Sequence, residues 1–240
     1  MFVHYRTTGF VFKKLDQSEA DQVFTIFTKD FGVLKILAKG IRKSASKLKS
    51  GIPIFCISEI EFIQGKTHKI LTDAILINNF ENIKKDLIKL RVAYKISETL
   101  DQLIKPPQKD EKIWNLLNEV FKNLNNDFLL VTHYSLLYFY FLLNLLSILG
   151  YHPELYECLI CRNKLKPQNL YFSFKGGIMC SSCKVKSKEH LVLNIDQNIV
   201  KILRESFKRN ISDFLKIRIK KQHQVSINQI SEFCLSHKIL

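Results

Sequence analysis

The sequence predicts a multidomain α+β protein in which an N-terminal five-stranded β-barrel is followed by an α-helical domain carrying an inserted four-cysteine module. Three observations support this fold class. Short apolar and β-branched runs dominate the first 80 residues, the apolar period then changes to three and four residues, and two Cys-x-x-Cys pairs follow residue 155. We expect the barrel at residues 1–80, the helical domain at 81–155 and 190–240, and the cysteine module at 156–189.

The first 80 residues contain five runs rich in Phe, Val and Ile, separated by turn residues. Gly32 closes the first clear hairpin turn, and Gly65 lies in the second. Five strands within this length suit a small closed barrel such as the OB-fold, which commonly binds nucleic acid. A five-stranded SH3-like barrel fits the spacing almost as well. The strands are expected at residues 4–15, 23–28, 33–38, 52–63 and 69–77.

Amphipathic helices are expected after residue 81, because apolar residues recur there at steps of three and four. The first should end before Pro106 and Pro107. The most apolar helix approaches the length of a membrane span, but polar residues are spread along it and no basic flank sets an orientation. We therefore expect a buried central helix and no membrane partner. The expected helices cover residues 82–104, 112–124 and 128–149, with two more between 195 and 240.

The charge of the chain is strongly positive and unevenly distributed. The net charge is +15, and it divides into +5 for residues 1–80, −1 for 81–157 and +11 for 158–240. Two basic terminal segments around a middle segment of nearly zero net charge are expected of a protein that binds a polyanion. The alternative is compositional drift, because 30 Lys against 7 Arg is typical of an AT-rich genome. Phosphate-loop, nucleophile-elbow and metalloenzyme motifs are absent from the sequence, so we expect no enzymatic activity.

The two cysteine pairs have the spacing of a zinc site. Two residues between cysteines allow a turn that directs both thiolates at one ion, and 18 residues separate the pairs. Four thiolates leave no open position, so the zinc is expected to be structural. Redox pairs are the alternative, but no thioredoxin-like βαβ pattern surrounds them. The first ten residues do not resemble an export signal, and we expect a cytoplasmic protein. The expected ligands are Cys158, Cys161, Cys180 and Cys183.

The segment at residues 39–49 is the expected nucleic-acid contact. It holds five basic residues and no acid, with small or hydroxyl residues between them. Such side chains neutralise phosphates and release counterions without reading sequence. A solvated loop is the alternative. The loop at residues 16–21 is acidic, so we expect binding on the face near the basic segment. The expected contacts are Lys39, Arg42, Lys43, Lys47 and Lys49.

The order of these parts resembles the bacterial recombination mediator RecO family over essentially the whole chain. The resemblance rests on residues 5–10 (YRTTGF), residues 38–43 (AKGIRK), the helical region and the two cysteine pairs with Gly177 before the second. It implies an OB-fold, a helical domain and a zinc module.

The resemblance also implies function and partners. Members of this family bind single- and double-stranded DNA, anneal complementary strands and work with RecR. They help load RecA onto DNA coated by single-strand-binding protein, whose acidic C-terminal tail they contact, and they act in the cytoplasm at the nucleoid. The alternative is a zinc-ribbon protein that regulates transcription or binds RNA. Such a protein would bind one sequence or RNA element preferentially, whereas a protein that anneals DNA must bind strands of any sequence.

Overall fold

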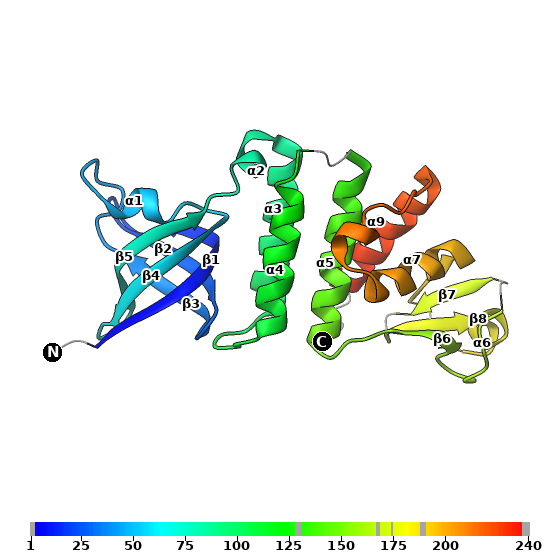
Figure 1. Cartoon of the computed structure of the whole chain (residues 1–240). Helices are drawn as coiled ribbons and strands as arrows, with labels where there is room; N and C mark the ends of the chain where they lie inside the picture. The colour runs from blue at the N-terminus through cyan, green and yellow to red at the C-terminus, as the bar shows by residue number, and fades with distance from the viewer. Residues whose placement is uncertain (1–2, 128–130, 167–168, 174, 188–190, 237–240) are drawn as a thin grey trace. The chain divides into compact units, whose positions relative to one another are not determined.

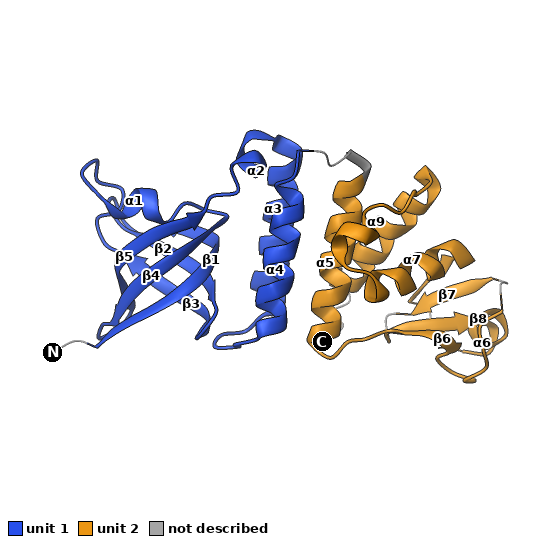
Figure 2. Cartoon of the chain, in the orientation of Figure 1, with its two compact units in different colours: residues 1–127 blue, residues 128–240 orange. Residues whose placement is uncertain are grey.

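The computed structural model describes residues 3–127, 131–166, 169–173, 175–187 and 191–236. The chain divides into two compact units, residues 1–127 and residues 128–240, coloured separately in Figure 2. The helices between residues 81 and 124 belong to the first unit, together with the barrel. The three-part division expected from the sequence grouped these helices with the later ones, and it stays a prediction.

The first unit begins with a closed barrel of five strands within the described residues: β1 (His4–Asp16), β2 (Gln22–Thr28), β3 (Gly32–Ala38), β4 (Cys56–Gln64) and β5 (Lys69–Asn78). The strand order is β1-β2-β3-β5-β4, and β1 pairs with β4 to close the barrel (Figure 1). The contact between β3 and β5 is parallel and short, at Ile36 and Leu37. This Greek-key order is that of an OB-fold and decides against the SH3-like alternative.

The barrel has an inner core and a second apolar layer outside it. Alternate side chains of a strand point to opposite faces, so Val11 of β1 lies in the barrel core while its neighbour Phe10 contacts a helix. The ring of Phe10 lies 4.4 Å from the ring of Phe121. Burial on both faces explains why four successive β1 residues are inaccessible to solvent.

A short helix, α1 (Leu48–Gly51), lies against β5 because Gly51 has no side chain there. A Cβ atom at Gly51 would approach the carbonyl oxygen of Ala74 to 1.9 Å, which is far inside van der Waals contact. The close approach fixes α1 and the basic residue Lys49 within it. The sequence did not predict this helix, and it delays the start of β4 to Cys56 from the expected residue 52.

The helix expected at residues 82–104 is divided in two, so that prediction was wrong in detail. Asp86 has an extended backbone between α2 (Glu81–Lys85) and α3 (Leu87–Leu103), and its carboxylate accepts bonds from the backbone N–H groups of Ile88 and Lys89. The break shifts the buried face, so Leu87 is 82% exposed and Lys89 is buried. Helix α4 (Glu111–Leu124) follows, capped by Asp110.

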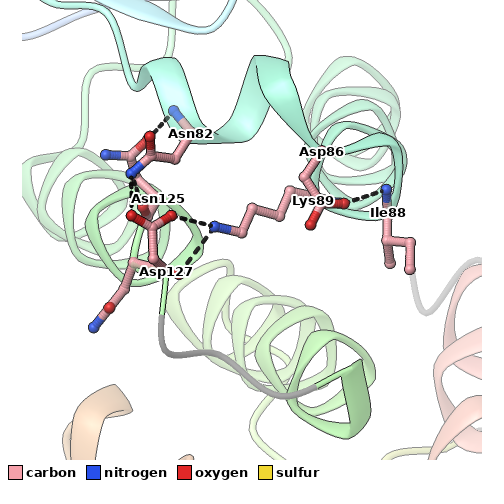
Figure 3. A network of polar contacts seen from close by, with 7 residues as sticks. Asn82, Asp86, Ile88, Lys89, Asn125 and Asp127 are labelled. Carbon is pink, nitrogen blue, oxygen red and sulfur yellow. Dashed lines mark hydrogen bonds and ion pairs between the residues drawn. The ribbon is translucent and has the colours of Figure 1, made fainter.

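A polar network joins α2 and the start of α3 to the residues that follow α4 (Figure 3). The side chain of Asn82 donates to the carbonyl oxygen of Asn125 and to the carboxylate of Asp127. The ammonium of Lys89 donates to the carbonyl oxygen of Asn126 at 3.0 Å. These bonds hold the segment at Asn125–Asp127, which follows the last residue of α4, against α2 and α3.

The second unit is built around α5 (Val131–Ile148), whose described side chains are largely buried. The expected helix began at residue 128, and residues 128–130 lie outside the described ranges. Helices α7 (Gln197–Lys208) and α9 (Lys221–Ser236) contact α5. The tail was expected to form two helices, but within the described residues it forms three, because Asn210 caps a short α8 (Ile211–Phe214) after α7 ends.

A sheet of four strands, within the described residues, precedes these tail helices. It has the order β6-β8-β7-β9 and is linked to α7 by Arg204, which donates two bonds to the carbonyl oxygen of Leu155. The strands are β6 (Glu154–Cys158), β7 (Leu170–Ser173), β8 (Gly177–Cys180) and β9 (Val192–Ile195). Among the helices of the described ranges, none combines the length and the apolar character that crossing a bilayer requires.

Candidate metal centre and nucleic-acid interface

The four expected ligand cysteines come together at one end of the small sheet. Cys158 ends β6 and Cys161 lies in the turn after it, whereas Cys180 ends β8 and Cys183 lies in α6 (Ser181–Lys186). Strands β6 and β8 are parallel neighbours. Their ends therefore meet at the same edge, and the pairing of two strands distant in sequence assembles the cluster.

The cluster has the size of a tetrahedral metal site. All four sulfur atoms lie within 4.8 Å of one another, and those of Cys161 and Cys180 are 4.0 Å apart. Four thiolates at 2.3 Å from a central ion would be about 3.8 Å apart. All six cysteines of the chain are free thiols. The residues present therefore fit a four-thiolate metal ion.

The local electrostatics also favour a cation. Burial opposes ionisation of Cys158, but the backbone N–H groups of Cys161, Cys180 and Ile160 outweigh it and lower the pKa of the Cys158 thiol to about 6. Burial and the three neighbouring sulfurs raise the pKa of Cys183 to about 12. The Cys158 thiolate thus forms readily, and its charge opposes ionisation of the neighbouring Cys183 thiol. A divalent cation is what allows four thiolates in so small a space.

The turn between Cys158 and Cys161 is closed by backbone bonds and one left-handed residue. The N–H of Arg162 donates to the carbonyl oxygen of Cys158 at 2.9 Å, and the N–H of Cys158 donates to that of Asn163 at 2.8 Å. Arg162 has φ +59°. This region is costly for residues other than glycine, so the turn carries local strain beside the cluster.

The expected DNA-contact residues lie in the loop between β3 and α1 and in α1 itself. All five are exposed, as a phosphate contact requires. The acidic loop at residues 16–21 lies against this segment: Nη1 of Arg42 is 3.3 Å from a carboxylate oxygen of Asp16, and the N–H of Gly40 donates to Asp21. The acidic loop therefore supports the basic segment and offsets part of the charge of Arg42.

A groove of about 560 Å³ borders the basic segment. Arg42 and Lys49 line it, and Lys39, Lys43 and Lys47 do not. Two further cations line the groove that sequence reasoning missed, Lys14 from β1 and Lys84 from α2. No local pattern marks them, because they lie in separate elements far apart in the sequence and only the fold brings them together.

Four phenylalanines of the barrel strands are structural. Phe10, Phe12, Phe24 and Phe27 are each 2% exposed or less, which leaves no face of these rings open to a base. Contacts through this groove would therefore be made by charge and backbone rather than by stacking.

Comparison with known proteins places these features in a family. Residues 1–80 match the N-terminal domain of recombination protein O, and residues 84–240 match its C-terminal domain. A DNA repair protein RecO from Dehalococcoides mccartyi is 30% identical over 219 residues, 91% of this chain and 84% of that protein. The counterpart from Caldanaerobacter subterraneus is 34% identical over 194 residues, 79% and 75% of the two chains. That from Acetivibrio thermocellus is 28% identical over 238 residues, 98% and 92%. The chain belongs to the recombination protein O family.

Proposed function

We propose that this protein is a DNA-binding mediator of DNA repair and homologous recombination. Its relatives carry the name DNA repair protein RecO, and they align with most of the chain. The observation that carries the proposal is the concentration of exposed cations on one side of the OB-fold barrel, in the loop at residues 39–49 and the adjoining groove. The barrel would bind single- and double-stranded DNA through phosphate contacts in the bacterial cytoplasm, at the nucleoid.

Annealing follows from the same chemistry. Two DNA strands repel each other through their phosphates, and a protein that neutralises one strand reduces the cost of bringing up the second. Such a step needs cations and no covalent chemistry, so the protein would act without catalysing a reaction. With RecR, it would help load RecA onto DNA that single-strand-binding protein covers.

Partner binding would involve the second unit. The acidic tail of single-strand-binding protein needs a basic partner surface, and residues 158–240 carry a net charge of +11. The guanidinium carbon of Arg204 lies 4.5 Å from the centroid of the exposed Tyr156 ring. The ammonium of Lys208 lies 5.8 Å from the same centroid. This combination of cations and aromatic surface suits an acidic peptide that carries an apolar residue.

The cysteine cluster would hold one structural zinc ion. Cys158, Cys161, Cys180 and Cys183 would occupy all four positions, and the ion would fix β6 and β8 to α6. Bound zinc would supply folding free energy to a sheet that is small on its own.

Equilibrium binding to a panel of unrelated oligonucleotides tests this function. The panel contains single-stranded DNA, duplex DNA and RNA hairpins of equal length, measured by fluorescence anisotropy at several salt concentrations. A mediator binds the DNA sequences with similar affinities that fall steeply with salt. Preference of a hundredfold or more for one duplex or RNA would instead support a zinc-ribbon regulator.

A further inference from the structure

The four cysteines of the cluster differ in their access to solvent. Cys158 is 0% exposed and Cys183 is 9% exposed. Cys161 is exposed, and Cys180 is half-buried. The two more accessible thiols belong to different Cys-x-x-Cys pairs, Cys161 to the first pair and Cys180 to the second. The cluster therefore has a buried side and a side that a small reagent can reach from solvent.

The accessible side of the cluster opens into a pocket of about 370 Å³. Cys161, Cys180 and Cys183 line this pocket, and Cys158 does not. Among the described residues of the lining, none is acidic, and the cations are Lys164, Lys166 and Lys186. A water molecule occupies about 30 Å³ of liquid volume, and hydrogen peroxide is only slightly larger. A small peroxide can therefore reach the sulfur atoms that line the pocket.

The two accessible sulfur atoms are close enough to react with each other. Those of Cys161 and Cys180 are 4.0 Å apart, whereas a disulfide bond is about 2.0 Å long. Cys161 lies in the turn after β6, outside any helix or strand. Cys180 ends β8, where it pairs with Leu170 of β7. Movement of the turn towards the strand end would close the remaining distance without breaking the sheet.

The buried side of the cluster is less suited to the same reaction. The backbone N–H of Cys158 donates to the carbonyl oxygen of Asn163 at 2.8 Å. The sulfur of Cys158 accepts a bond from the backbone N–H of Cys180 at 3.4 Å. Cys183 lies within α6. An oxidant from solvent therefore meets Cys161 first, and the accessible thiolate beside it is that of Cys180.

Oxidation by a peroxide accounts for every atom and electron with two thiolates alone. The sulfur of Cys161 attacks one peroxide oxygen, the O–O bond breaks, and hydroxide leaves, which forms a sulfenic acid. The sulfur of Cys180 then attacks the sulfenic sulfur, the S–S bond forms, the S–O bond breaks, and a second hydroxide leaves. The thiolates lose two electrons, the peroxide gains them, and protons from solvent convert both hydroxides to water.

We propose that Cys161 and Cys180 form an oxidation site, at which a peroxide closes a reversible disulfide and releases the bound metal. The site rests on the proposed zinc ion and is independent of DNA binding by the barrel. The disulfide removes two of the four ligands, and Cys158 and Cys183 alone do not complete a tetrahedral site. Unlike a redox Cys-x-x-Cys motif, this bond joins the two pairs. Thiol reductants reverse it by exchange.

A peroxide titration of the full-length, zinc-loaded protein tests the oxidation site. A chromogenic chelator measures the released zinc, and mass spectrometry of unreduced peptides maps the disulfides. The test variant is C161H, because three cysteines and one histidine still hold zinc whereas an imidazole forms no disulfide. The matched control is C56A/C234A, which removes two buried thiols and leaves all four ligands in place. Zinc content before the titration verifies that each protein is loaded.

Wild type and the control should release one zinc per chain at the same rate. The main disulfide in both should join Cys161 to Cys180, and dithiothreitol with added zinc should restore the metal. C161H should release its zinc about tenfold more slowly, because the accessible sulfur that meets the oxidant is gone. If C161H does not bind zinc, the disulfide map of the control decides.

Three results would overturn the oxidation site. The first is a main disulfide within one Cys-x-x-Cys pair or between Cys158 and Cys183. The second is equal zinc release from C161H and wild type. The third is zinc retained by wild type at a peroxide dose that oxidises free cysteine in the same buffer. Wild type that takes up no zinc would remove the proposed metal centre and this site together, and the proposed DNA-binding function would still stand.

Discussion

The ammonium of Lys89 lies 3.4 Å from a carboxylate oxygen of Asp127, although the two residues differ sharply in exposure (Figure 3). The side chain of Lys89 is 5% exposed and that of Asp127 is 69% exposed. Because water screens the carboxylate, the ion pair itself contributes little. The bond from Lys89 to the carbonyl oxygen of Asn126 and the burial of its aliphatic stem matter more.

Replacement of Lys89 should therefore destabilise the first unit more than replacement of Asp127. K89A removes a charge-assisted bond and buried methylene groups, and we expect a loss of about 2–3 kcal/mol. D127N keeps an oxygen acceptor for Asn82 and should cost less than about 1 kcal/mol. Urea unfolding followed through the single tryptophan, Trp114 of α4, measures both. Equal losses would show that the ion pair dominates.

Removal of one cysteine should sharply weaken metal binding and destabilise the second unit. Cys161 is exposed, so C161S loses little packing and its effect reports the metal. We expect one zinc per chain in wild type and well under half of that in C161S, with a lower unfolding temperature. C234A is the control, because Cys234 is buried away from the cluster. Mass spectrometry measures the zinc content per chain of each variant. Full zinc content in C161S would contradict the four-thiolate site.

Residues of the basic segment should differ in their contribution to DNA binding. Arg42 and Lys49 line the groove, and Lys39 and Lys43 do not, although all four are exposed. R42Q/K49Q should therefore lower the salt slope and the affinity more than K39Q/K43Q, at equal loss of charge. Anisotropy titrations with one oligonucleotide compare them. Identical losses would indicate that only the net charge of the segment matters.

DNA affinity should fall as the pH rises into the alkaline range. Burial lowers the pKa of Lys84, with Lys14 adding to the effect, whereas a bound phosphate favours the charged ammonium. Binding thus raises the pKa of Lys84. The affinity is therefore full below the pKa that Lys84 has in the free protein, and it falls as the pH rises above that value. Glu81 also acts on Lys84 and raises its pKa, which opposes the effect of burial. Cys56 lies near Lys84 too, but burial raises the pKa of its thiol to about 11 and keeps it neutral.

The K84R variant isolates this effect, because arginine stays charged throughout the range. Dissociation constants for wild type and K84R, measured between pH 7 and pH 10, should diverge as the pH rises, with wild type weakening first. Parallel curves would show that Lys84 does not contact the phosphates.

Local sequence patterns predicted most of the elements but not the way in which they meet. Strand runs and cysteine spacing are local signals, and both led to segments close to those observed. The break at Asp86 escaped prediction because apolar residues recur at steps of three and four on both sides of it, so the helical period alone does not separate α2 from α3. The groove escaped because Lys14 and Lys84 become neighbours only through the packing of α2 on the barrel.

The central claim, that this protein mediates pairing of DNA, is tested most directly by annealing. Two complementary oligonucleotides coated with single-strand-binding protein are mixed with and without the protein, without nucleotide, across a salt series. The account predicts a rate at least tenfold higher with wild type, an acceleration that fades as salt rises, and a reduced effect in K14Q/K84Q. An annealing rate that the wild-type protein leaves unchanged at every salt concentration would contradict it.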